Sequence, residues 1–158
     1  MVHKINYKIF LISTAIPIGV GALSALITRK NMDLYSKISV PILSPPDWIF
    51  PIVWTILYLL MGISLYIVVD SKVAKFKKNQ AIIVFAIQLL LNFIWSPLFF
   101  YYKQFLWCFI ILVVMFALVF VMTILFYNIS KTAGIIQIPY LMWIVFAGYL
   151  NFSIYLIN

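Results

Sequence analysis

Five long stretches without a charged residue divide this sequence, and they limit its fold more than any other feature. Each stretch is 20 to 27 residues long, and charged residues separate one from the next. Because a helix rises about 1.5 Å per residue, about 20 residues cross a hydrocarbon layer about 30 Å thick. We therefore predict one all-α integral membrane domain over residues 1–158, built as a bundle of five transmembrane helices. The predicted spans are residues 9–28, 48–69, 80–102, 104–127 and 134–156.

The composition excludes a water-soluble globule. Hydrophobic residues make up 66% of the chain and charged residues 9%, and the mean hydropathy is +1.16. A soluble fold of this composition could not cover its surface with polar groups. A membrane β-barrel would show segments of about ten residues with alternating polar and apolar positions, and these runs do not alternate. We expect the protein to be embedded in a lipid bilayer.

The positive charge follows the pattern of membrane topology. The net charge is +8, but the sequence has no stripe of arginines with exposed aromatics, so nucleic acid is not an expected partner. With five spans, the N-terminus and the second and fourth loops share one side of the membrane. That side holds Lys4, Lys8, Lys72, Lys75, Lys77, Lys78 and Lys131, against Arg29, Lys30, Lys37 and Lys103 on the other. The positive-inside rule therefore predicts a cytoplasmic N-terminus, in what we expect to be a bacterial plasma membrane.

The connection between the first two spans, residues 29–46, is the longest in the chain and ends in two consecutive prolines. Proline disfavours helix at the residue before it, so the second helix should begin near Asp47 or Trp48, with Asp47 as a candidate cap. The loop also carries Tyr35 and Leu43, which are more apolar than a plain surface linker needs. It is therefore expected to act as a lid over the end of the bundle. A disordered tether is the alternative interpretation.

Aromatic residues recur at intervals of four along the second span. They form a stripe with one glycine, made of Trp54, Tyr58, Gly62 and Tyr66. We expect the ligand of the protein to lie against this stripe.

The third and fifth spans each carry a distinctive face. In the third span, three polar residues recur every four positions beside a tryptophan: Gln88, Asn92 and Ser96, with Trp95. In the fifth, aromatic, small and polar residues share a face: Tyr140, Trp143, Ala147 and Asn151, with Phe146 and Leu150 beside it. Polar groups that face lipid cost several kcal/mol, so the polar face should point into the bundle. These faces either contact a ligand or hold the bundle together by hydrogen bonds and packing, and a tryptophan can also mark the bilayer interface.

The first and fourth spans give weaker signals. In the first, Pro17 with Gly19 and Gly21 indicates a kink beside a cavity, and the alternative is close helix packing through Gly21 and Ala25. The fourth, residues 104–127, is almost entirely aliphatic and aromatic. We expect it to face lipid or a second subunit.

The sequence offers almost nothing for ordinary catalysis or metal binding. It has no glutamate, its single histidine is His3, and its three aspartates fall at or beyond predicted helix ends. We therefore predict no metal site, no acid or base catalyst and no required cofactor. An enzymatic role would have to rest on light, oxygen and tryptophan oxidation.

The sequence resembles the TspO/MBR family in three segments, which read SPPDWIFPIVWTILYLLMG, QLLLNFIWSPLFF and PYLMWIVFAGYLN. Members of this family include the tryptophan-rich sensory proteins of bacteria and the mitochondrial translocator protein, also called the peripheral-type benzodiazepine receptor. The resemblance covers most of the chain. It implies a five-helix bundle, usually a homodimer, with one cavity in each subunit closed by the first loop.

The resemblance also implies a ligand and a site. Family members bind porphyrins such as protoporphyrin, and some bind cholesterol or synthetic isoquinoline and benzodiazepine ligands. The matching positions imply a cavity lined by Trp54, Asn92, Trp95, Trp143, Phe146, Ala147 and Leu150, with Tyr58, Tyr140, Tyr35 and Pro45 near its mouth. Either Asn92 or Gln88 is expected to orient a polar edge of the ligand.

Three functions are compatible with these observations. The first is a membrane receptor or carrier for tetrapyrroles and related hydrophobic ligands. The second is a light-dependent porphyrin-degrading enzyme, because relatives with this activity are reported to use the equivalents of Trp54 and Trp143. The third is a regulatory or structural membrane partner.

Two departures from the family pattern bear on the ligand. Two tryptophans that the family carries in its first loop are absent here, which weakens the case for porphyrin gating by that loop. No Lys or Arg follows Asn151, so cholesterol recognition through the steroid motif of the mitochondrial members is unsupported.

Overall fold

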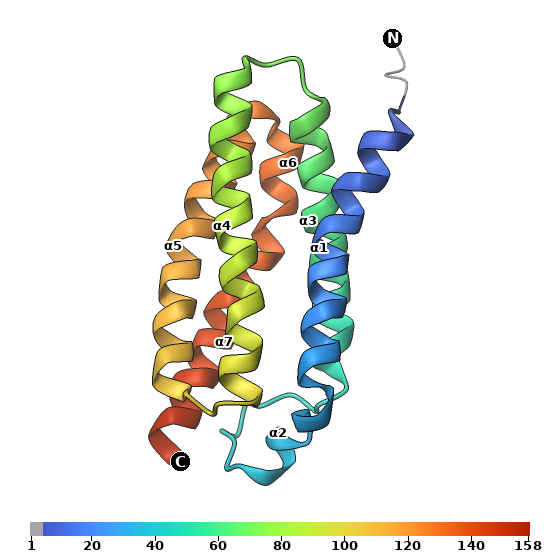
Figure 1. The fold of residues 1–158 in the computed structure, drawn as a ribbon. Coiled ribbons are helices and arrows are strands. Elements are labelled where there is room, and N and C mark those ends of the chain that lie inside the picture. The colour runs from blue at the N-terminus through green and yellow to red at the C-terminus, as the bar shows by residue number, and fades with distance from the viewer. Residues whose placement is uncertain (1–4) are drawn as a thin grey trace.

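A computed structural model describes residues 5–158, which form an elongated bundle of helices (Figure 1). The elements in chain order are α1 (Tyr7–Thr28), η1 (Arg29–Asn31), α2 (Leu34–Lys37), α3 (Ile49–Asp70), α4 (Lys75–Phe100), α5 (Phe105–Ile129), α6 (Lys131–Ile136) and α7 (Ile138–Ile157). The α3–α4 connection lies at one end of the bundle, and α2 and the α4–α5 turn lie at the other (Figure 1).

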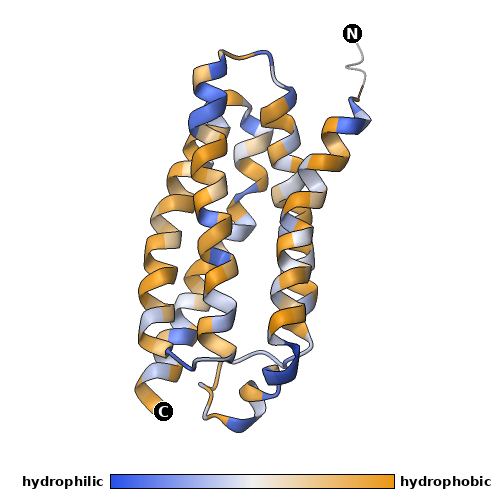
Figure 2. Cartoon of the chain, viewed as in Figure 1, coloured by the Kyte–Doolittle hydropathy of each residue, from blue (hydrophilic) through white to orange (hydrophobic). Residues whose placement is uncertain are grey.

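The prediction of five membrane-spanning helices is confirmed. Within residues 5–158, five helical segments are long and apolar enough to cross a membrane. Apolar residues dominate the length of the bundle, and hydrophilic residues gather toward its two ends (Figure 2). Helix α3 begins at Ile49 and, among the described residues, no side chain caps it, so the prediction of Asp47 as a cap was wrong. Helix α4 begins at Lys75 instead of residue 80, because a helix can continue beyond the hydrocarbon layer that defined the prediction.

The fifth span consists of two helices. The sequence analysis had predicted one continuous segment over residues 134–156. Helix α6 ends at Ile136 and α7 begins at Ile138, with Gln137 between them. Pro139 lies in the first turn of α7, and it has no N–H to donate to the preceding turn. The two helices together still form one apolar segment of 27 residues.

Helix α1 packs against α3 through glycines. A Cβ added to Gly62 would lie 2.5 Å from Cα of Thr14, and one added to Gly21 would lie 2.3 Å from Cε2 of Tyr58. Only glycine lets the two helices approach this closely. The interpretation of Gly21 as a packing residue is therefore confirmed. The half of the α3 stripe that holds Gly62 and Tyr66 faces α1, where the Tyr66 ring lies 5.3 Å from that of Phe10.

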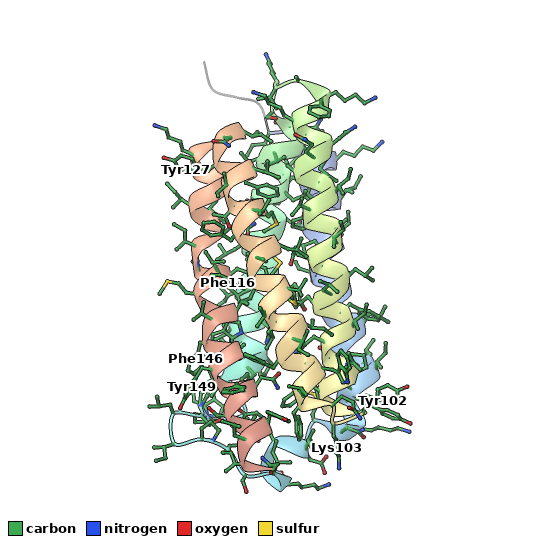
Figure 3. The ribbon with its side chains drawn as sticks, turned by 90° about the vertical axis from the view of Figure 1, so that its left-hand side faces the viewer. Tyr102, Lys103, Phe116, Tyr127, Phe146 and Tyr149 are labelled. Carbon is green, nitrogen blue, oxygen red and sulfur yellow. The ribbon has the colours of Figure 1, made fainter. Side chains whose placement is uncertain are left out.

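Helix α5 contributes to the core as well as to the outer surface. Its Met115, Val119 and Met122 are at most 1% exposed, and the helix lies against α4, α6 and α7. Its other side includes Phe116 and Phe120, which are exposed; Phe116 is labelled in Figure 3. One side of the helix is therefore exposed, as a surface toward lipid or a second subunit would be, while the other side is packed in the core.

The first loop is folded and covers one end of the bundle (Figure 1). Leu34 of α2 is buried in a cluster with side chains of α4, α5 and α7. The hydroxyls of Tyr35 and Ser44 share a 2.7 Å hydrogen bond. The backbone of Ser39 makes two hydrogen bonds, of 3.0 and 2.9 Å, with the side chain of Asn158. These contacts agree with a lid and contradict the disordered tether.

Candidate functional site

A cavity of about 180 Å³ lies at the end of the bundle that the first loop covers. Its walls come from α1, the first loop, α3, α4 and α7. The lining residues are Gly21, Ser24, Ala25, Thr28, Met32, Tyr35, Asp47, Phe50, Pro51, Trp54, Tyr58, Asn92, Trp95, Ser96, Phe99, Phe100, Ala147, Leu150, Asn151 and Ile154. Segments far apart in the sequence therefore meet around a single cavity.

The structure brings seven of the twelve predicted site residues to this cavity. They come from the loop, α3, α4 and α7, and they are Tyr35, Trp54, Tyr58, Asn92, Trp95, Ala147 and Leu150. The expectation that the second, third and fifth spans turn toward a common hollow is met by these residues. Their role in binding a ligand stays a prediction.

Aromatic rings form much of the lining. On α3, the rings of Trp54 and Tyr58 lie 5.5 Å apart. The ring of Tyr35, from the loop, meets Phe50 at 5.0 Å in an edge-to-face contact. On α4, Trp95 stacks on a phenylalanine with 5.0 Å between the ring centres. These contacts leave the cavity with flat, apolar walls that fit an aromatic ligand.

A chain of hydrogen bonds leads from the cavity wall into the core. The hydroxyl of Tyr58 donates to Oδ1 of Asn92 at 2.7 Å, and Nδ2 of Asn92 donates to the Tyr140 hydroxyl at 3.0 Å. That hydroxyl donates in turn to Oε1 of Gln88 at 2.8 Å. Tyr140 and Gln88 are almost fully buried and lie outside the cavity lining. The two residues therefore support the wall from behind, and their contact with a ligand stays a prediction.

Three other predicted residues also lie outside the lining. The Trp143 ring packs against that of Phe50, 6.1 Å away, and Phe50 itself lines the cavity. Phe146 stacks with Tyr149 on one side of α7 (Figure 3). Pro45 is half-buried in the loop. The cavity-facing stripe of α7 begins one turn after Trp143, at Ala147, and continues through positions 150, 151 and 154.

Helix α1 supplies a further wall; the sequence analysis placed Gly21 beside a possible cavity but did not assign Ser24 or Thr28 to it. Its lining residues follow the spacing i, i+3, i+4, i+7, as Gly21, Ser24, Ala25 and Thr28. All four are small, whereas their neighbours in the run are mostly bulky and aliphatic. This periodicity of small residues was a usable signal for a recess beside α1.

The charge of the cavity is slightly negative. Among the described residues that line it, Asp47 is the one charged side chain. Arg29 and Lys30 follow directly after Thr28, the last lining residue of α1, and both are exposed. Cationic groups therefore stand outside the lining, near its edge.

Comparisons with known proteins agree with this architecture. The TspO/MBR family model matches residues 13–156. A tryptophan-rich protein TspO of Chlorobaculum tepidum is 37% identical over 142 residues, which are 89% of this chain and 90% of that protein. A tryptophan-rich sensory protein of Cereibacter sphaeroides is 32% identical over 94% of this chain and 89% of its own length. The translocator protein of Bos taurus is 31% identical over 90% of this chain and 85% of its own length.

Proposed function

This chain belongs to the TspO/MBR family, and we propose that it is a membrane receptor or carrier for a protoporphyrin-type tetrapyrrole or a related flat, hydrophobic molecule. The ligand would lie in the cavity between α1, α3, α4 and α7, beneath the first loop. Two things support the proposal, the family resemblance and the chemistry of the cavity walls.

The aromatic lining is the observation that carries the proposal. Trp54, Tyr58 and Trp95 all line the cavity. Indole and phenol faces stack on flat rings, and burial of apolar surface contributes about 25 cal/mol per Å². Small-molecule sites are usually concave and mostly apolar, with a few polar groups that orient the ligand. A planar macrocycle with an apolar face suits such walls.

The size of the cavity adds a condition to the proposal. Sites for drug-sized ligands commonly hold roughly 300–1,000 Å³, whereas this cavity holds about 180 Å³. A tetrapyrrole is larger than this space, so it would fit only in part unless a wall moves. The first loop is the wall that can move without separating two membrane-spanning helices. We propose that an outward displacement of the loop makes room for the whole macrocycle.

A titration of the purified protein with protoporphyrin, in darkness, tests the proposal through quenching of tryptophan fluorescence. We expect saturable quenching in the wild type and binding weaker by at least about tenfold in Ala147→Leu, because the larger side chain fills the cavity. The neighbouring substitution Gly148→Ala is the matched control, since its Cβ meets no described atom within 4 Å. Absence of saturable quenching in the wild type, or equal affinity in Ala147→Leu, contradicts the proposal.

The same titration under illumination tests the enzymatic alternative. A light-dependent loss of the porphyrin absorption band that disappears in Trp54→Phe would favour degradation over simple binding. Trp54 is the informative position because it lines the cavity, whereas Trp143 lies outside the lining.

The topology and assembly of the protein are part of the proposal. Of the lysines assigned to the N-terminal side, Lys4 lies outside the described residues; Lys8, Lys77 and Lys131 belong to the end of the bundle opposite the first loop. This distribution supports a cytoplasmic N-terminus in a bacterial plasma membrane, with the cavity toward the other side. An impermeant maleimide applied to intact cells should label a cysteine placed at Lys103 and not one placed at Lys77. The family resemblance further supports a homodimer, which light scattering of the detergent-solubilised protein tests.

A further inference from the structure

Three polar side chains in the cavity wall have no hydrogen-bond partner among residues 5–158. They are the Ser24 hydroxyl, the Trp95 indole N–H and the Asn151 amide, of which both the oxygen and the nitrogen are unpaired. Ser24 is 4% exposed and Asn151 is 1% exposed. All three residues line the cavity, and they come from α1, α4 and α7.

Such groups are uncommon in a folded protein. Most buried polar atoms are paired, because an unpaired donor or acceptor has lost its hydrogen bonds to water without replacing them. Other buried polar atoms without a partner among the described residues belong to Gln88, Gln137 and Trp143, which lie outside the cavity lining. Ser24, Trp95 and Asn151 differ from these residues because each of them forms part of the cavity lining, so a small side-chain rotation would turn its polar group toward a bound molecule.

The sequence analysis expected Asn92 or Gln88 to orient a polar edge of the ligand. The side-chain amide of Asn92 is already hydrogen-bonded within the protein. Its oxygen accepts from Tyr58 and its nitrogen donates to Tyr140. A ligand that used the amide of Asn92 in place of these partners would break bonds that the empty protein already has. A ligand that used Asn151 would add hydrogen bonds to an amide that has none among the described residues.

We propose that Asn151, Ser24 and Trp95 form the polar subsite of the cavity, where they bind a neutral, hydrogen-bonding edge of the ligand. The indole N–H and the amide nitrogen donate, the amide oxygen accepts, and the Ser24 hydroxyl does either. These groups are uncharged, and Asp47 is the one charged residue among the described lining. An ester, amide or hydroxyl edge therefore fits this subsite, whereas a carboxylate would enter without a counterion. This inference rests on the proposed function, because it assigns the recognition of the same ligand.

The thermal stability of the empty protein separates a binding role from a structural one. In Asn151→Leu we expect a higher melting temperature, because the change removes an unpaired buried amide. The matched control Asn92→Leu should lower the melting temperature, because it removes a paired one. Ser24→Ala should leave the melting temperature unchanged or raise it, while Ser64→Ala should lower it. The Ser64 hydroxyl is buried like that of Ser24, but it donates to the Ala133 carbonyl at 2.6 Å.

Binding of two porphyrin probes then tests the chemistry of the subsite. Protoporphyrin carries two carboxylates, and its dimethyl ester replaces them with neutral carbonyl acceptors. We expect the wild type to bind the ester at least as tightly as the acid. Asn151→Leu should bind the ester at least about tenfold more weakly than the wild type, and Ser24→Ala should weaken it by a smaller factor.

Each outcome decides between the two proposals. If the wild type binds neither probe, both the proposed function and the proposed subsite are wrong. If the wild type binds the probes and both variants bind them equally well, the subsite alone is overturned. A lower melting temperature of the empty protein in both Asn151→Leu and Ser24→Ala also overturns it, because that result assigns both side chains to folding.

Discussion

The hydroxyl of Tyr58 donates a 2.7 Å hydrogen bond to Oδ1 of Asn92, which joins α3 to α4 across the inner end of the cavity. The ring of the same tyrosine lies against Gly21 of α1. One side chain is therefore fixed by two other helices, and it is 8% exposed. Because Asn92 also donates to Tyr140 on α7, this part of the wall is coupled to the core of the bundle.

Loss of the Tyr58 hydroxyl should destabilise the bundle. In Tyr58→Phe, the oxygen of Asn92 loses its partner in a buried site, and we expect the free energy of unfolding to fall by about 1 kcal/mol. Thermal unfolding in detergent measures the change. Tyr155→Phe is the control, because Tyr155 is 40% exposed. Equal melting temperatures for the two variants would show that the bond to Asn92 contributes nothing.

A methyl group at Gly21 should disturb the cavity wall, whereas one at Gly19 should not. A Cβ at position 21 would lie 2.3 Å from the Tyr58 ring, and one at position 19 would meet no described atom within 4 Å. Gly21→Ala must therefore shift the ring and strain its bond to Asn92, a cost of about 1–3 kcal/mol. Gly19→Ala should be neutral or stabilising, because alanine favours a helix by about 1 kcal/mol over glycine. Melting temperatures of the two variants provide the comparison, and equal values contradict the packing described here.

The spans could be predicted from sequence because each depends on a local property, a long run without charge. The interruption at Gln137 could not, because Pro139 is equally compatible with the start of a helix and with a bend inside one. The sequence also could not distinguish the packed side of α5 from its exposed side. Nearly every residue of this helix is apolar, so its sequence contains no contrast to distinguish the side that packs against α4 and α7 from the side that faces lipid.

The sequence predicted the candidate site correctly where the type of a residue is enough to assign it to the inner face of its helix. Trp54 and Asn92 were assigned to the hollow and both line it. Whether a polar side chain finds a hydrogen-bond partner depends on residues far apart in the sequence. Only the structure shows that Asn92 is paired and that Asn151 has no partner within residues 5–158. The position of Trp143 also depends on a distant residue, since its ring packs against Phe50 of α3, which lines the cavity.

Lys78 should stabilise the C-terminal end of α3, which lies at the end of the bundle opposite the first loop (Figure 1). Its ammonium group donates to the carbonyls of Val69 and Ser71 at 3.1 and 2.8 Å. A cation near the last carbonyls of a helix contributes typically about 0.3–1 kcal/mol. Lys78→Met should therefore lower the melting temperature, while Lys77→Met, at an exposed neighbouring lysine, should not. A drop of the same size in both variants would point to the loss of net charge instead of these two bonds.

The side chain of Asn158 should act as a latch on the first loop. It accepts a hydrogen bond from the Ser39 N–H and donates one to the Ser39 carbonyl. Loss of both bonds in Asn158→Ala removes about 1–1.5 kcal/mol from the closed loop, which corresponds to about a tenfold larger open population. Asn158→Asp keeps the acceptor and loses the donor, so its effect should be intermediate. Faster hydrogen exchange in Asn158→Ala at the Ser44 amide, which donates to the Pro41 carbonyl and not to Asn158, measures the loosening of the loop without a ligand.

The same two variants connect loop opening to ligand entry. If the loop must move before a macrocycle can enter, the association rate of protoporphyrin should rise in the order wild type, Asn158→Asp, Asn158→Ala, and stopped-flow fluorescence quenching measures it. The melting temperature should change little, because Asn158 and Ser39 lie at the exposed edge of the fold. Faster amide exchange with an unchanged association rate would mean that the ligand enters by a path that does not pass the loop, for example between two helices from the bilayer.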